Sequence, residues 1–258
     1  MAVTPVLSAL RYYPVKGFQG EALSECALER QALLPGDRAW AFASGHAKTE
    51  SYDADSWLPK KHFLQVMSFA ELIGLRIKPD TQAQRFSLYQ HDQLVTEADW
   101  SDAGAIGALC AALQTLLEQA GATLPGTISL RHLSAGGFSD TRTPWITVGG
   151  MASLNDFARA TGTAPDMDRF RLNLWLDTGT AFEELDWTGQ RAQIGQAILK
   201  FTEPVGRCDA INSDPVSGAR HDDLPGWMRA HYGHSDLGVF AEVEQSGQVA
   251  LGDKLIWL

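Results

Sequence analysis

Cys208 stands out among the side chains that could do chemistry, because its neighbours are not those of a core residue. The stretch TEPVGRCDAINSDPVSG (202–218) sets it between Arg207 and Asp209, with turn-forming residues on both sides. A thiolate is both a nucleophile and a soft metal ligand, and a cationic neighbour favours it. The segment therefore predicts either a reactive or metal-ligating thiol or a loop cysteine that fills a gap, and the residues alone leave both readings open.

The other two cysteines occupy apolar patterns. Cys110 lies on the hydrophobic face of a predicted helix over residues 101–121, and Cys26 lies in an alternating strand pattern, so we interpret both as small core side chains. No CxxC pair occurs, which excludes a zinc ribbon or a thioredoxin motif. Three widely spaced cysteines argue against a disulfide framework and favour a reducing compartment, so we expect a cytoplasmic protein.

The histidines form no recognisable ligand set. His231 and His234 have a ligand-like spacing, but the glycine between them breaks up a helical face, so loop histidines in water are the favoured reading. HExxH is absent, and so are the GxGxxG and GxxxxGK[ST] phosphate loops. A histidine partner that would make Cys208 hydrolytic stays open.

Basic residues recur beside predicted strand ends. They are Lys16, Arg38, Arg142, Arg169 and Arg171. Such residues are either solvated surface charges or, if the strand ends converge, an anion pocket, for which the forked donors of arginine are suited. The formal net charge of -10 gives no reason to expect binding to nucleic acid or to an anionic membrane. We also expect no secretory signal and no membrane span, because no suitable apolar run occurs.

The elements that must position these residues are mostly strands. Alternating runs fill the first hundred residues, including a hairpin over 85–97. A long helix is predicted over 101–121 with Asp99 or Ser101 as its cap, and a second over 151–162 with Ser153 as its cap. The last residues predict a hairpin about Ser246–Gly247 and a final strand. We expect a mainly β, α+β chain with two parts, residues 1–97 and 98–258.

Three regions resemble the MOSC proteins, the family of the molybdenum-cofactor-sulfurase C-terminal domain. YYPVKGFQGEAL and PGDRAW resemble the opening of the N-terminal β-barrel subdomain that often precedes this domain. FRLN (170–173) is similar to the family's FRPN, with Leu172 in place of the proline. GRCDAINSDPVSG and GQVALGDKLIWL resemble the cysteine-bearing segment and the closing strand. The resemblance implies a β-barrel MOSC domain (98–258) packed against a smaller N-terminal β-barrel subdomain (1–97).

The resemblance also implies a cofactor, molybdenum held by molybdopterin. Cys208 matches the cysteine that ligates the metal, and Asp209 beside it is its expected partner in catalysis. The residues expected to bind the cofactor are Lys16, Arg38, Arg142, Arg171 and Asn173.

The implied activity is that of a molybdenum-dependent oxidoreductase. Relatives of this type, such as the mitochondrial amidoxime-reducing component, reduce small N-hydroxylated compounds. No four-cysteine iron–sulfur motif occurs in the chain, so electrons are expected from a separate ferredoxin- or flavoprotein-like donor. Two alternatives remain: a carrier of the cofactor, or of sulfur as a persulfide on Cys208, and a binding module without chemistry.

Overall fold

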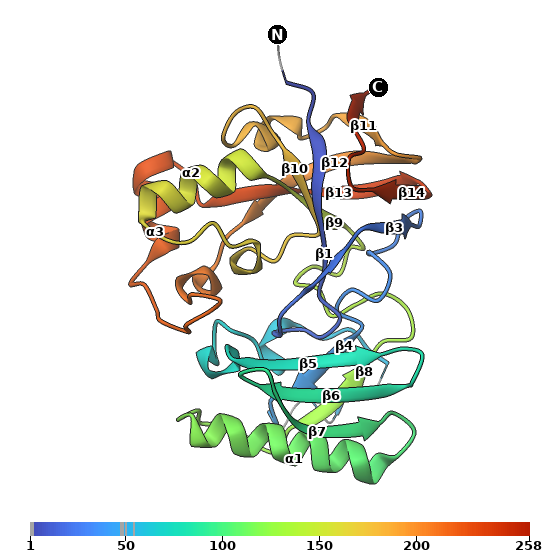
Figure 1. Cartoon of the computed structure of the whole chain (residues 1–258), viewed down its shortest axis with the longest axis vertical. Coiled ribbons are helices and arrows are strands. Elements are labelled where there is room, and N and C mark those ends of the chain that lie inside the picture. The colour runs from blue at the N-terminus through green and yellow to red at the C-terminus, as the bar shows by residue number, and fades with distance from the viewer. Residues whose placement is uncertain (1–2, 47–48, 50, 54) are drawn as a thin grey trace.

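Eight strands form one curled sheet in the computed structural model of the chain (Figure 1), which describes residues 3–46, 49, 51–53 and 55–258. In spatial order the strands are β15 (Leu255–Trp257), β11 (Arg191–Ile194), β12 (Ala197–Gly206), β13 (Asp236–Gln245), β9 (Ile146–Gly150), β10 (Leu174–Asp177), β1 (Val6–Tyr12) and β2 (Glu21–Leu23). Alternating apolar residues face inward along β11 and β12, as period-2 strands with one buried face require.

The curl brings β1 back to the chain just before β15. The backbone N–H of Leu7 donates to the carbonyl of Asp253 at 2.8 Å, and that of Leu255 donates to the carbonyl of Pro5 at 2.9 Å. Aliphatic side chains from the strands, with Trp187 and Phe201, fill the enclosed space as one core. This confirms the predicted mainly β fold with few helices.

The elements below this sheet in Figure 1 enclose a second core. It joins the sheet of β5 (Leu75–Asp80), β6 (Arg85–Gln90) and β7 (Gln93–Asp99) to α1 (Ala103–Gln119), beside the pair β4 (Trp40–Ala43) and β8 (Ser129–His132). The predicted hairpin over 85–97 is confirmed by the pairing of β6 with β7. Cys110 is buried on the inner face of α1, as predicted.

Strands from the first part of the chain pair with strands from its second half. β1 pairs with β10, and β3 (Glu25–Leu28) pairs with β14 (Gly247–Ala250). α1 in turn packs on the sheet formed by β5, β6 and β7. Elements from both sides of the expected boundary at residues 97–98 therefore share sheets and cores, and the boundary itself stays a prediction.

Both predicted helix caps are wrong. Asp102 caps α1, accepting from the N–H groups of Gly104 and Ala105, whereas Asp99 accepts from Ser101. α2 (Met151–Thr161) begins after Gly150, and the hydroxyl of Ser153, inside the helix, donates at 2.7 Å to a buried carboxylate, Glu184. Asp102 therefore takes the role expected of Asp99 or Ser101, and α2 begins without a side-chain cap.

The predicted terminal hairpin is also wrong. β13 pairs with β12 and β9, whereas β14 crosses to β3. Gly247 permits this crossing, since a Cβ there would lie 2.3 Å from the carbonyl carbon of Gln196. The remaining elements are α3 (Leu224–Tyr232) and the 3-10 helices η1 (Lys60–His62), η2 (Ala70–Leu72), η3 (Met167–Arg169), η4 (Glu183–Trp187) and η5 (Asp209–Asn212). Within the described ranges, no helix has the length and apolar character needed to cross a membrane.

Candidate functional site

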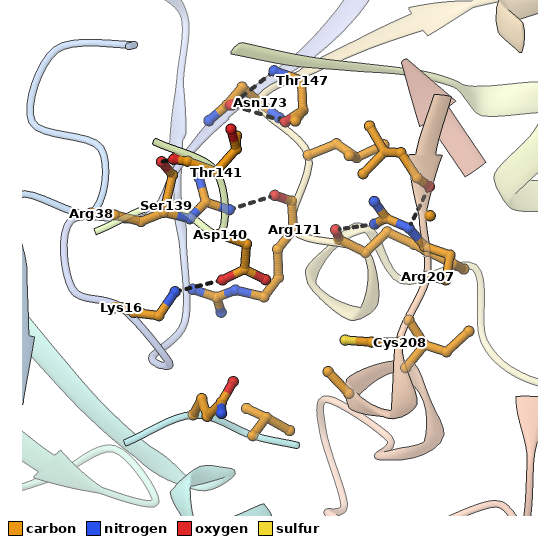
Figure 2. Close-up of a pocket in the computed structure, with 18 of the residues that line it drawn as sticks. Lys16, Arg38, Ser139, Asp140, Thr141, Thr147, Arg171, Asn173, Arg207 and Cys208 are labelled. Carbon is orange, nitrogen blue, oxygen red and sulfur yellow. Dashed lines mark hydrogen bonds and ion pairs between the residues drawn. The ribbon is translucent and has the colours of Figure 1, made fainter. Parts of the chain in front are cut away.

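A cavity of about 190 Å³ opens beside a further apolar cluster, which includes Phe170, Leu172 and Val205 (Figure 2). The turn after β1, the 139–147 segment, the segment before β10 and the end of β12 all contribute to its wall. Predicted site residues that line it are Lys16, Arg38, Arg171, Asn173 and Cys208. The fold thus brings together side chains that are up to about two hundred positions apart in the sequence.

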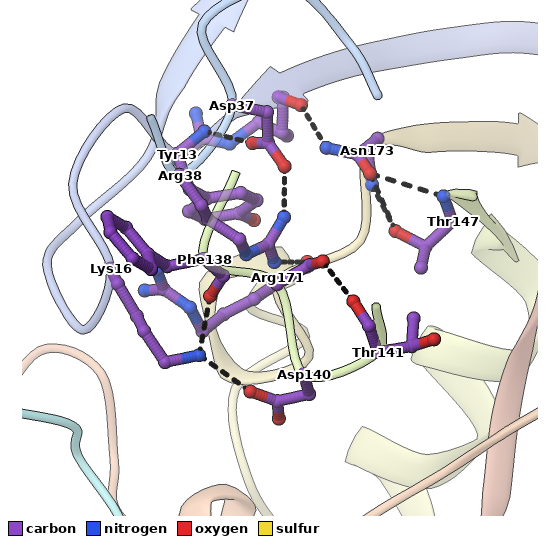
Figure 3. A network of polar contacts seen from close by, with 12 residues as sticks. Tyr13, Lys16, Asp37, Arg38, Phe138, Asp140, Thr141, Thr147, Arg171 and Asn173 are labelled. Atoms are coloured by element: carbon purple, nitrogen blue, oxygen red, sulfur yellow. Dashed lines mark hydrogen bonds and ion pairs between the residues drawn. The ribbon is translucent and has the colours of Figure 1, made fainter. Parts of the chain in front are cut away.

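Cationic side chains gather at one end of the cavity (Figure 3). Lys16 is only 6% exposed, and its Nζ donates to the carbonyl of Phe138 at 2.8 Å and to Asp140 Oδ1 at 2.7 Å. Burial lowers the pKa of Lys16, because a charged ammonium loses hydration there. Arg38 pairs with the buried Asp37 and donates from Nη2 to the carbonyl of Arg171 at 2.9 Å. We call Lys16, Arg38 and Arg171 the cationic cluster.

The aromatic ring of Tyr13 supports two members of this cluster. The guanidinium carbon of Arg171 lies 4.4 Å from the ring centroid, and that of Arg38 lies 5.0 Å from it. Both arginines have left-handed backbones, with φ of 56° and 54°. Such conformations cost a side-chain-bearing residue free energy and tend to occur where function fixes a geometry.

The cavity wall carries more positive than negative charge. Lys16, Arg38 and Arg169 each have a carboxylate partner. Within the described part of the chain no ion pair forms to Arg171 or Arg207, and Arg171 Nη2 is buried with no hydrogen-bond partner. Burial lowers the pKa of Arg207 to about 10. Because buried cations are costly without a counter-charge, this wall fits an anionic ligand.

Cys208 lies at the other end, where β12 gives way to η5 (Figure 2). Arg207 N donates to the carbonyl of Ser235 at 2.8 Å, and Ile211 N donates to the carbonyl of Cys208 at 3.1 Å, which fixes the backbone around the thiol. The side chain is half-buried and lines the cavity instead of packing in a core. The polar, turn-rich sequence around this cysteine is what ends the strand and begins the 3-10 turn.

Asn173 has its carboxamide engaged with the protein. Its Oδ1 accepts from Thr147 N at 3.2 Å and from Thr147 Oγ1 at 2.9 Å, and its Nδ2 donates to the carbonyl of Arg11 at 3.3 Å. These bonds tie β9 and β1 to the residue just before β10. Contact between Asn173 and a cofactor stays a prediction.

Two predicted site residues do not line the cavity. Arg142 is exposed, with its guanidinium carbon 5.8 Å from the centroid of the Trp57 ring. Asp209 is exposed as the first residue of η5. The cavity instead receives Ser139, Asp140 and Thr141, which we did not predict. In the sequence this segment is marked by Gly136 and Gly137 just before it, and in the structure a Cβ at Gly137 would lie 2.2 Å from the carbonyl oxygen of Asp37.

The chain alone offers no complete metal site in the described residues, since no three His, Cys, Asp or Glu side chains are grouped to hold an ion. A metal here would need further ligands from a bound cofactor. The residues present fit such a group, because a thiol lines one end of the cavity and an unpaired, buried guanidinium nitrogen of Arg171 lies at the other.

Cys208 is expected to react with iodoacetamide much faster than the other two cysteines in cofactor-free protein. Burial raises the pKa of the Cys26 thiol to about 11 and also raises that of Cys110, so few thiolates form there. Peptide mass spectrometry after timed labelling measures the three rates. Equal rates, or faster labelling of Cys26, would contradict an accessible Cys208 thiol.

Asp140→Asn is expected to reduce the fall in Tm between pH 4 and pH 2. Partial loss of hydration would raise the pKa of Asp140, whose side chain is 60% exposed, but the charge of Lys16 and its hydrogen bond lower it to about 2. Since this pKa is below the ordinary value of 3.8, the carboxylate stabilises the fold above about pH 4, and that contribution is lost as pH falls towards 2. Thermal unfolding at pH 4, 3 and 2 should show a smaller fall in Tm for the variant, and an unchanged fall would refute the pairing with Lys16.

Comparisons with known proteins give one family model and several partial relatives. Residues 146–256 match the family model described as the MOSC domain. The molybdenum cofactor sulfurase of Drosophila mojavensis is 33% identical over 100 residues, which are 35% of this chain and 13% of that protein. The sulfurase of Drosophila grimshawi is 35% identical over 95 residues, which are 34% of this chain and 12% of that protein. The chain therefore corresponds to a small part of these relatives.

Among solved structures, the YuaD protein of Bacillus subtilis aligns over 99% of this chain and 96% of its own, with 12% identity and a TM-score of 0.41.

Proposed function

Residues 146–256 of this chain match the MOSC domain model, and on that premise we propose that the chain binds the molybdenum cofactor in the cavity described above and uses it as an oxidoreductase. One observation carries the proposal. A half-buried thiol, Cys208, lines the same cavity as Arg171, which has no carboxylate partner in the described chain and whose Nη2 is buried without a hydrogen bond. A soft ligand at one end and an anion site at the other match the two ends of a metal-bearing, phosphorylated pterin.

The cationic cluster would hold the phosphate of the cofactor. Arginine donors fit phosphate oxygens in pairs, and the ammonium of Lys16 adds a point charge. Cys208 would supply the protein's ligand to molybdenum. Arg207 beside it is held by hydrogen bonds to the carbonyls of Val205 and Phe170 and adds a positive charge to the same wall.

The proposed reaction is the reduction of a small N-hydroxylated compound. The N–O bond breaks, two electrons and two protons are taken up, and an N–H group and water are formed. When bound, the metal would supply the two-electron chemistry, and we propose that a separate ferredoxin- or flavoprotein-like protein supplies the electrons. Asp209, exposed in the turn after Cys208, is the proposed proton carrier between solvent and the site.

Turnover with an artificial donor tests this activity. Purified protein is mixed with reduced methyl viologen and benzamidoxime, and benzamidine is quantified. We expect product from the wild-type chain and none above background from Cys208→Ala. If molybdenum-loaded protein oxidises no donor and forms no benzamidine or other reduced product from a panel of N-hydroxylated compounds, the oxidoreductase proposal fails.

Sulfur or cofactor transfer is the second candidate function. It is favoured by the position of Cys208, half-buried yet lining a cavity, and by relatives that are named molybdenum cofactor sulfurases. A carrier would show a persulfide on Cys208 by mass spectrometry and pass that sulfur to an acceptor without redox turnover. Turnover without a detectable persulfide would instead favour the enzyme.

A further inference from the structure

The segment before β10 is tied to the chain on both sides of Cys208. Arg169 Nη1 donates to the carbonyls of Ile211 and Ser213, at 2.8 and 3.0 Å. Arg169 Nη2 pairs with Asp214 Oδ2 at 2.8 Å. These three acceptors belong to η5, which directly follows Cys208, and to the turn after it.

The residue preceding Cys208 is held by the same segment. Arg207 Nη1 donates to the carbonyl of Phe170 at 2.8 Å. Two adjacent residues, Arg169 and Phe170, therefore fix the backbone before and after the thiol. Arg171, the next residue, donates to the carbonyl of Phe18 and accepts from Arg38, so the segment also joins the cationic cluster.

The contacts of Arg169 suit it to hold the turn after Cys208 and not to bind an anion. Its side chain is 0% exposed, and both Nη atoms already donate to the turn. Its remaining nitrogen, Nε, is buried without a partner. A guanidinium is costly to bury, so the bonds to the turn must offset that cost, and the turn is thereby fixed in one position.

We propose that Arg169 is a positioning residue, which holds the turn after Cys208 so that its sulfur faces the cavity at a set distance from the cationic cluster. The purpose of that sulfur rests on the proposed function, but its position does not. If Arg169 is removed, the turn loses its three anchoring bonds, and the thiol gains freedom to leave the cavity wall.

The test is the alkylation rate of Cys208 in Arg169→Met, with iodoacetamide as the probe. Rates are taken in cofactor-free protein at two pH values, and each is divided by the wild-type rate of the same cysteine, so that a ratio that does not change with pH reports accessibility and not ionisation. We expect the rate at Cys208 to rise about tenfold, because the loss of one charge-assisted hydrogen bond corresponds to about that factor. Cys26 and Cys110 should keep their rates. Molybdenum content per chain of protein purified with cofactor should fall by about the same factor.

Three further variants keep the proposal falsifiable. Arg169→Lys retains a charge for Asp214 and should recover part of both readouts, whereas Asp214→Asn leaves the two carbonyl bonds and should change them less. Arg159→Met removes an arginine whose side chain is 76% exposed on α2 and should change neither. If Arg169→Met does not fold, Arg169→Lys decides, since it should still raise the Cys208 rate above that of the wild type.

An unchanged Cys208 rate in a folded Arg169 variant would overturn the inference, and so would an equal rise at all three cysteines, which indicates general loosening. If the wild-type chain binds no molybdenum, the proposed function fails, but the alkylation rates still decide the role of Arg169.

Discussion

Cys208→Ala is expected to purify without molybdenum while keeping its fold. The thiol lines the cavity and is the soft ligand there, so its loss removes the chain's bond to the metal. The side chain is only half-buried, so its truncation should cost less than the roughly 2–5 kcal/mol of a core substitution. Elemental analysis gives the molybdenum per chain, and thermal unfolding gives the stability.

Cys26→Ala is the matched control, because Cys26 is also partly buried but packs against the core of the large sheet. It should keep the metal content of the wild type. Full molybdenum occupancy in Cys208→Ala would disprove the ligand assignment. Unfolding of Cys208→Ala, with Cys26→Ala stable, would mean that Cys208 is a structural residue.

Lys16→Met and Arg171→Met are expected to weaken anion binding strongly. Each removes a charge-assisted hydrogen bond worth about 1.5–3 kcal/mol, so the affinity for a phosphate monoester should fall about tenfold or more for each variant. Asp140, which pairs with Lys16, has a side chain 60% exposed, so it can be hydrated when Lys16 is replaced. Calorimetric titration with phenyl phosphate at constant ionic strength measures the change.

Arg38 is a poorer choice for this experiment. Its partner Asp37 is 1% exposed, so Arg38→Ala would leave a buried carboxylate without its cation and destabilise the fold. Arg85→Met, on an exposed ion pair of β6, is the control and should bind as the wild type does. Unchanged phosphate binding in the Lys16 and Arg171 double variant would show that the anion binds elsewhere on the protein. The same titration of Arg142→Met tests whether that exposed arginine takes part.

Part of this site could be predicted from residue type and local sequence. Cys208 sits in a polar, turn-rich segment, and Lys16 and Arg38 follow turn-forming residues, so each was expected at the end of a strand. The resemblance to MOSC proteins supplied the expectation that these ends meet. Their convergence on one cavity depends on strand pairings such as that of β3 with β14. The alternation of apolar and polar residues does not specify such a pairing, because any strand with that pattern could be the partner.

The partners of the charged residues could not be predicted from the sequence. Asp140 meets Lys16, and Arg169 meets Asp214, over separations of 124 and 45 positions. Nothing local marks such pairs, since burial after folding decides which charges must be compensated. Asp209 shows that residues adjacent in the sequence need not share a site. Its neighbour Cys208 faces the cavity, but successive residues entering a 3-10 turn point in different directions, and Asp209 is exposed.

The most direct test of the account is the molybdenum content of the wild-type chain, purified freshly from cells that make the complete cofactor. We expect close to one molybdenum and one pterin-bound phosphate per chain, since a single cavity combines the Cys208 thiol with the cationic cluster. Protein that carries no molybdenum, from cells in which another molybdenum protein is fully loaded, would contradict the proposal that this cavity holds the cofactor.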